Sequence, residues 1–119
     1  MDPRVLKVIE AMRAGLQQRL SVSRMAATVN LSPSRFQHLF KMETNMTPAS
    51  YLKSLRIEEA RRLLETTFLT NQEIIARVGL SDESHFARDF KKAYGLSPGR
   101  YRARHHSHKT LSAQAGNVE

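Results

Sequence analysis

The chain has 119 residues, 40% of them hydrophobic, a size that suits one domain with a hydrophobic core of its own. It contains no cysteine, which excludes disulfides, thiolate catalysis and cysteine metal sites. Nineteen Lys and Arg against eleven Asp and Glu leave a net charge of +8. Such a surface attracts polyanions such as nucleic acid, and basic domains also bind acidic proteins or membrane surfaces.

The first predicted elements are helices, because each proline follows a residue that can cap a helix start. Proline has no N–H to lose at the first helical position, and a side-chain oxygen just before it can accept a free backbone N–H. These pairs are Asp2-Pro3, Ser32-Pro33, Thr47-Pro48 and Ser97-Pro98. Further starts are Ser21, Thr70 with Glu73 in the spacing of a capping box, and Ser81. With no alternating strand pattern, the chain is predicted to be all-α, with helices at 3–18, 22–29, 33–44, 48–65, 71–78, 82–94 and 98–104.

A short unit occurs twice along these helices. Residues 34–51 match residues 84–101 at an offset of 50, where Ser, Phe, Phe, Lys, Pro and Tyr coincide, while upstream the offset is 49. Each copy is a short helix, a turn at Asn30 or Gly79, and a longer helix with two Phe at i and i+4. Asn and Gly adopt a left-handed backbone most easily. The pattern is that of a helix-turn-helix, whose second helix enters the major groove of DNA.

A long helix between the copies is the predicted spacer. Its apolar residues form an inward stripe, and Glu58 and Arg62 lie at i and i+4 on the outer side. The stripe consists of Tyr51, Leu52, Ile57, Ala60, Leu63 and Leu64. About eighteen residues give a rod of about 27 Å, able to hold two recognition helices about 34–36 Å apart, one turn of B-DNA. One chain could therefore bind DNA as a monomer.

The predicted organisation has four parts. Residues 1–46 hold the N-terminal helix and first helix-turn-helix, 47–66 the linker helix, 67–104 the second helix-turn-helix, and 105–119 a disordered tail. If the Phe residues face inward, the polar residues between them face outward. Residues early in a recognition helix reach base edges, and later or flanking ones meet phosphates.

The predicted contacts follow from this geometry. Base contacts are expected from Ser34, Arg35, Gln37, His38, Glu83, Ser84, His85 and Arg88. Phosphate contacts are expected from Lys41, Lys91, Lys92, Arg100 and Arg102. Arg can bridge guanine O6 and N7, Gln can bridge adenine N6 and N7, and a carboxylate such as Glu83 can accept from a cytosine amino group. The alternative for each of these residues is an ordinary solvated surface side chain.

Two stretches resemble the DNA-binding domain of the AraC/XylS family of bacterial transcription regulators, over about residues 4–103. They are "MAATVNLSPSRFQHLFKMETNMTPASYLKSLRIEEARRLL" and "IIARVGLSDESHFARDFKKAYGLSPGRYR", the latter with Gly79-Leu80, the spaced Phe86 and Phe90, and the closing Gly95-Leu96-Ser97-Pro98. The resemblance implies seven helices, two helix-turn-helix subdomains joined by a long helix, and promoter binding. The chain departs from it in two ways: most members also carry a sensor domain, and Asp89 occupies the position of Leu39. Either the chain is a short stand-alone member, or it is the DNA-binding part of a longer protein.

The remaining sequence features bear on other function classes. His105, His106 and His108 lie in the predicted tail without fixed geometry, and no nucleophile constellation or phosphate-binding glycine loop is present, so no enzyme, metal or cofactor is predicted. A nonspecific nucleic-acid-binding helical module remains a rival. The predicted partners are double-stranded promoter DNA, with RNA polymerase as a further candidate. No apolar run could cross a bilayer, so no membrane partner and a cytoplasmic location are predicted.

Overall fold

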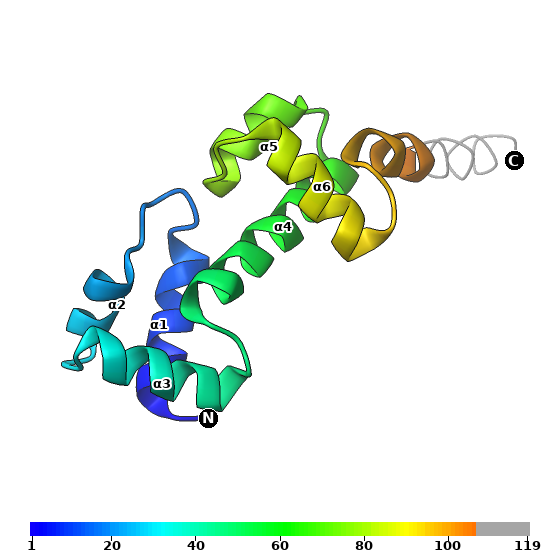
Figure 1. Cartoon of the computed structure of the whole chain (residues 1–119). Coiled ribbons are helices and arrows are strands. Elements are labelled where there is room, and N and C mark those ends of the chain that lie inside the picture. The colour runs from blue at the N-terminus through cyan, green and yellow to red at the C-terminus, as the bar shows by residue number, and fades with distance from the viewer. Residues whose placement is uncertain (107–119) are drawn as a thin grey trace, which may run out of the picture. The chain divides into compact units, whose positions relative to one another are not determined.

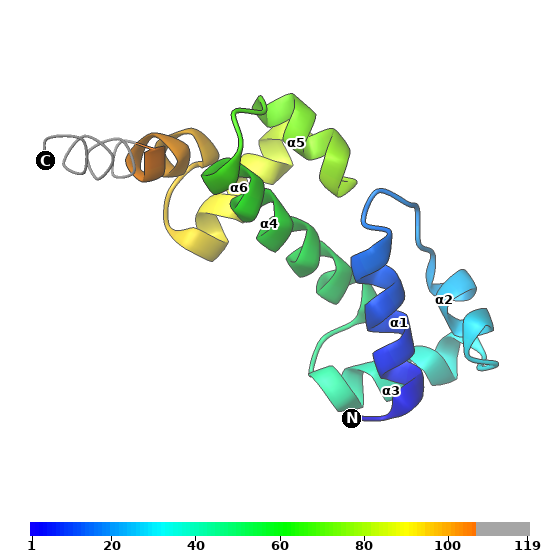
Figure 2. The same ribbon diagram turned by 180° about the vertical axis from the view of Figure 1, so that it is seen from behind.

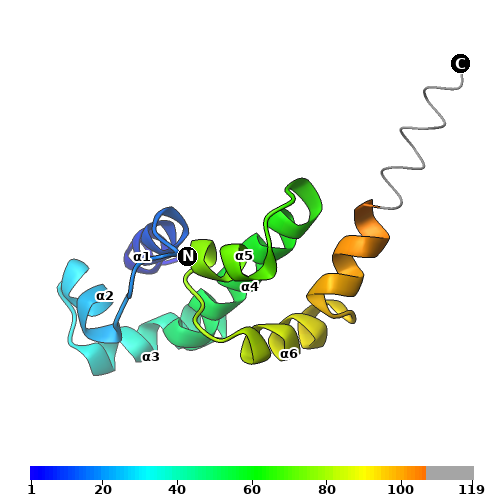
Figure 3. The ribbon, with the colours of Figure 1, turned by 90° about the horizontal axis from the view of Figure 1, so that it is seen from above.

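The computed structural model describes residues 1–106 and is divided into two compact units, the first ending at Arg56 and the second beginning at Ile57 (Figure 1). Six helices are α1 (Pro3–Ala14), α2 (Val22–Thr28), α3 (Pro33–Thr44), α4 (Pro48–Thr66), α5 (Asn71–Val78) and α6 (Glu83–Tyr94). Residues 98–106 form a seventh, drawn in orange after α6 in Figure 3. Every regular element in the described part of the chain is a helix, which confirms the all-α prediction.

Several helices begin at the capping residues that the sequence predicted. The side chains of Asp2, Ser21 and Ser32 accept the backbone N–H of the residue two or three positions on. Thr70 and Glu73 form the predicted capping box, with N–O distances of 3.0 and 3.1 Å. Each cap satisfies an N–H that the helix leaves free, and replacing such a residue by Ala typically costs about 1 kcal/mol.

Five helix boundaries differ from the predicted ones, and two of them, the ends of α2 at Thr28 and α4 at Thr66, differ by one residue. The first helix ends at Ala14 rather than residue 18, because the N–H of Gly15 closes the last turn on the carbonyls of Ala11 and Met12. The sixth helix begins one residue late, at Glu83, and its cap is Asp82 rather than Ser81. The seventh continues through residue 106, past its predicted end at 104. The rest of the predicted tail, 107–119, lies outside the described residues.

The first unit closes around its own hydrophobic core. Both α1 and α2 pack against α3. Figure 2 views the molecule from behind, where α1 lies in front of α3. After α1 the chain is fixed by Arg56 of α4, which donates to the carbonyls of Leu16 at 3.0 Å and Gln18 at 2.9 Å. Burial lowers the pKa of Arg56. The core consists of Val5, Val8, Ile9, Met12, Met25, Ala26, Val29, Phe36, Phe40, Leu52 and Leu55.

The second unit repeats this packing with other residues. Its core consists of Ile57, Ala60, Leu63, Leu64, Ile74, Ile75, Val78, Phe86 and Phe90. The ring centroids of the Phe pair lie 5.7 Å apart in each unit. The second Phe of each pair meets a Tyr edge-on, at 5.4 Å for Phe40 and Tyr51 and 5.3 Å for Phe90 and Tyr101. The duplication seen in the sequence is therefore also a duplication of the core.

The long helix α4 belongs to both units, because its buried residues divide between the two cores. Leu52 and Leu55 are in the first core, and the buried residues from Ile57 onward are in the second. The boundary between units thus falls inside the helix predicted as a linker.

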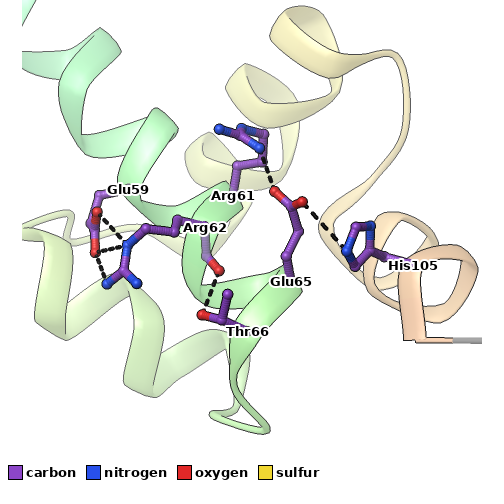
Figure 4. Close-up of polar contacts among 6 residues, drawn as sticks. All are labelled: Glu59, Arg61, Arg62, Glu65, Thr66 and His105. Carbon is purple, nitrogen blue, oxygen red and sulfur yellow. Dashed lines mark hydrogen bonds and ion pairs between the residues drawn. The ribbon is translucent and has the colours of Figure 1, made fainter. Parts of the chain in front are cut away.

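Polar contacts along the second part of α4 are shown in Figure 4. Arg62 pairs with Glu59, three residues earlier, at 2.5 Å. Arg61 pairs with Glu65, whose other carboxylate oxygen lies 3.4 Å from Nε2 of His105 in the seventh helix. Arg61 also lies 5.7 Å from the centre of the Tyr94 ring. These contacts attach the seventh helix to α4 within the second unit.

Candidate nucleic-acid interface

The turn between the two helices of each motif has the same geometry in both units. Asn30 and Gly79 have φ values of 58° and 83°, in the left-handed region predicted for them. The following Leu donates its N–H back to a carbonyl of the short helix, at 3.1 Å for Leu31 to Ala26 and 3.0 Å for Leu80 to Ile75. A left-handed residue with such a bond ends one helix and lets the chain turn at once into the next.

In the first unit, α3 presents one apolar and one polar face. Phe36 and Phe40 are buried, and Leu39 packs half-buried at the edge of the core. The polar residues before and between the two Phe are exposed, and they include all the predicted base contacts: Ser34, Arg35, Gln37 and His38. Ser32 fixes the start of the helix by accepting the N–H of Arg35 at 3.2 Å. The polar side chains therefore start from a helix whose position is set by buried Phe and by a cap.

The second unit presents α6 in the same way. Phe86 and Phe90 are buried, and the predicted base contacts Glu83, Ser84, His85 and Arg88 are all exposed. Asp89 is half-buried like its counterpart Leu39, and it interacts with another group of the protein. Four of the predicted phosphate contacts are exposed: Lys41, Lys91, Lys92 and Arg100.

Arg102 is the exception among the predicted contacts. It is half-buried, and its Nε and Nη2 atoms are shielded from solvent and make no hydrogen bond to another described residue. At the offset of 50, Arg102 occupies the position of Leu52, which lies in the first core. Part of this side chain therefore lies on the packed face of the seventh helix, and its phosphate contact stays a prediction.

Asp82, which was not among the predicted site residues, caps the start of α6. Its Oδ1 accepts the N–H of His85 at 2.9 Å, and its Oδ2 lies 3.8 Å from Nδ1 of the same His. The hydrogen bond from the His85 backbone lowers the pKa of this carboxyl, with further contributions from Ser84 and Arg88. The repeat left two candidates, since Ser32 corresponds to Ser81 at the upstream offset of 49 and to Asp82 at the offset of 50, and in the structure Asp82 is the cap.

The two units differ in charge. Residues 1–56 contain nine Lys and Arg against three Asp and Glu, a net charge of +6. Residues 57–106 contain nine against seven, a net charge of +2. The first turn of α3 has no acidic residue, whereas α6 begins with Asp82 as its cap and Glu83 as its first residue. The positive charge that attracts a polyanion is therefore concentrated in the first unit.

The histidines near the end of the described chain take part in packing. His105 contacts Glu65 and stacks on Tyr101, and the ring of His106 meets Phe68 with centroids 5.1 Å apart. His108 lies outside the described residues. Within residues 1–106, no three His, Asp or Glu residues are grouped so that they could hold a metal ion, and no helix is long and apolar enough to span a membrane.

Comparison with known proteins relates this geometry to characterised families. Residues 25–104 match the model of a helix-turn-helix domain family. The chain is 35% identical to the arabinose operon regulatory protein of Escherichia coli over 104 residues, which cover 87% of this chain and 36% of that protein. It is 39% identical to the MmsAB operon regulatory protein of Pseudomonas aeruginosa over 93 residues, which cover 78% of this chain and 30% of that one. The chain thus spans about a third of the length of these relatives.

Solved structures agree with the sequence matches. The DNA-binding domain of the global transcriptional factor AdpA, in complex with a target DNA, superposes with a TM-score of 0.84 at 26% identity, covering 90% of this chain and 96% of that one. An AraC-type transcriptional regulator from Chromobacterium violaceum gives a TM-score of 0.81 at 27% identity, covering 87% and 92%. Two helix-turn-helix units with matching cores, the family model and these relatives lead to one assignment: the chain belongs to the AraC family of helix-turn-helix DNA-binding domains.

Proposed function

We propose that the chain regulates transcription by inserting α3 and α6 into successive major-groove segments of one promoter. The observation that carries this proposal is the matched exposure of the two helices. In each unit the Phe pair is buried, a side chain caps the helix, and every residue predicted to contact bases is exposed. A recognition helix needs this division between a fixed apolar face and a free polar one.

The proposed contacts are assigned by the chemistry of each side chain. Arg35 and Arg88 suit guanine, since a guanidinium can bridge O6 and N7, and Gln37 suits adenine. His38, Ser34, Ser84 and His85 supply single hydrogen bonds, and Glu83 would accept from a cytosine amino group. Lys41, Lys91, Lys92 and Arg100 would contact phosphates, which hold the protein in register without reading sequence. Arg102 is proposed as a further phosphate contact, through the part of its half-buried side chain that is not shielded.

Single substitutions on α6 test this assignment. Arg88→Ala is expected to weaken binding to the preferred duplex by about 1–3 kcal/mol and to relax base preference in one half of the site, because a bidentate base contact is lost. Lys91→Ala is the matched control, since it removes one charge from the same helix and should weaken all sequences alike. Fluorescence anisotropy with a duplex selected from a random pool, and with a random duplex of equal length, measures both effects. Unchanged affinity of the Arg88 variant for the selected duplex would contradict the proposed face of α6.

We also propose that one chain occupies the whole site. The duplicated units within each chain support this, because two half-sites normally need two subunits when each brings one motif. Sedimentation of the complex with the selected duplex should give one chain per duplex. The rival, a nonspecific helical module, would instead bind selected, random and single-stranded DNA with equal affinity.

Further partners belong to the same proposal. A promoter-bound regulator acts on RNA polymerase, and we propose the polymerase as the second partner, with the cytoplasm as the compartment where both meet the chromosome. Because the matched part covers only 36% and 30% of these relatives, a sensor domain in a longer parent protein is compatible with this role. In vitro transcription from a template carrying the selected site should change when the chain is added. Equal transcript levels with and without the chain would remove the polymerase from the proposal.

A further inference from the structure

The start of α6 carries a carboxylate that capping alone does not require. Asp82 accepts the N–H of His85, as Ser32 accepts the N–H of Arg35 at the start of α3. Ser and Asp are comparable caps, so either residue would serve to begin the helix. The side chain of Asp82 remains 51% exposed, and its Oδ2 lies 3.8 Å from Nδ1 of His85.

The carboxylate is ionised and lies among the proposed base contacts of α6. Its pKa is lowered, first by the backbone N–H of His85 and also by electrostatic interaction with the side chains of His85 and Arg88 and by the N–H of Ser84. Asp82 therefore stays negative throughout the neutral range. Glu83, the next residue, is exposed as well, so two carboxylates lie at the end of the helix that base reading uses most.

A negative charge at this position opposes binding to any phosphate backbone. Nonspecific affinity for DNA comes almost entirely from the attraction of Lys and Arg to phosphates. The second unit already has a net charge of only +2 against +6 in the first, and the carboxylates at the start of α6 reduce the attraction further. In the major groove, a carboxylate becomes favourable only where a base offers a donor, as cytosine does with its amino group.

We propose that Asp82 is a specificity-determining residue of the second unit, whose charge keeps α6 off DNA that offers no base-edge donor to its first turn. The first unit, with the larger positive charge, then supplies most of the sequence-independent affinity. This inference rests on the proposed function, because it takes α6 as a helix that enters the major groove.

Asp82→Asn tests the proposal without disturbing the fold. Asn caps a helix as well as Asp, so the variant removes the charge and keeps the hydrogen bond to His85. Its affinity for a random duplex is expected to rise roughly two- to fivefold at low salt, and the gain should shrink as salt is added because screening shortens the reach of the charge. Affinity for the selected duplex should stay the same or fall, so the ratio of selected to random affinity falls.

Two further variants test whether the effect depends on where the charge lies or only on the net charge of the protein. Asp2→Asn changes the net charge equally at the cap of α1, where Asp2 pairs with Arg4, and it should change random-duplex affinity less. Ser32→Asp adds a capping carboxylate to α3 and should lower random-duplex affinity. Thermal unfolding of each variant checks that the caps still hold.

The outcomes are distinct. The proposal is supported if Asp82→Asn lowers the ratio of selected-duplex to random-duplex affinity while Asp2→Asn changes this ratio little. An unchanged ratio, or equal effects of the two Asn variants, overturns it. If the parent protein itself binds selected and random duplexes equally, the proposed function fails first.

Discussion

Replacing Phe90 by Ala is expected to lower the free energy of unfolding by about 3–5 kcal/mol, the usual range for a buried Phe. Phe90 is fully buried and meets the rings of Phe86, Tyr94 and Tyr101. The change therefore leaves a cavity where α6 and the seventh helix pack together. A typical domain has only about 5–15 kcal/mol of stability, so a large share of it would be lost.

The loss should be confined to the second unit. The core around Phe90 contains no residue before Ile57, and the first core contains none after Leu55. Hydrogen exchange should therefore show faster exchange in α5 and α6, with little change in α1 and α3. Phe40→Ala, at the equivalent position, is the matched control and should show the reverse. Equal loss of protection in all helices of either variant would show that the two cores unfold as one.

The double variant Arg35→Ala/Arg88→Ala is expected to weaken binding to the selected duplex by about 2–6 kcal/mol, the sum of two lost base contacts. The two residues lie on different recognition helices in separate units, so their effects should add. Anisotropy titrations of the two single variants and the double variant give the comparison. A random duplex serves as the control, because each variant also loses positive charge.

Additivity is the informative result. If both units bind the same duplex, each Ala removes its own contact whether or not the other is present. If the double variant binds the selected duplex as tightly as the single variant with the lower affinity, only one recognition helix binds in the parent protein. The seven-helix fold would stand, but reading by two helices would not.

Much of the fold could be predicted because its signals are local. A capping oxygen lies beside the helix it begins, so Asp2, Ser21, Ser32 and Thr70 were identified without knowledge of tertiary structure. The left-handed turns at Asn30 and Gly79 follow from residue type in the same way.

The sequence left a choice open where neighbouring residues competed for one role. Ser81 and Asp82 can both cap, and only the hydrogen bond to His85 decides for Asp82. Glu58 and Glu59 are both within one turn of Arg62, and the structure pairs it with Glu59. In both cases the choice depends on side-chain geometry, which spacing alone leaves open.

Arg102 shows a different limit. Arg is usually exposed, so its type predicted a phosphate contact. Its place in the repeat gave the opposite indication, since Leu52 is in the core at the equivalent position. Likewise His105 corresponds to Leu55, and it packs on Tyr101 and Glu65. Position in a repeat was a better guide to burial here than chemical type.

The helix ends with positive φ also restrict how the repeat can diverge. Each unit has two such residues, Asn30 and Asn45 in the first and Gly79 and Gly95 in the second. At Gly95 a Cβ would meet no atom within 4 Å, so only backbone strain opposes a side chain there. Over evolution, Asn and Gly can replace each other at these ends with little loss, whereas β-branched residues cannot enter. Distant copies of this unit should therefore be recognisable by a Gly or Asn that follows each short and each long helix, even after their surface residues have changed completely.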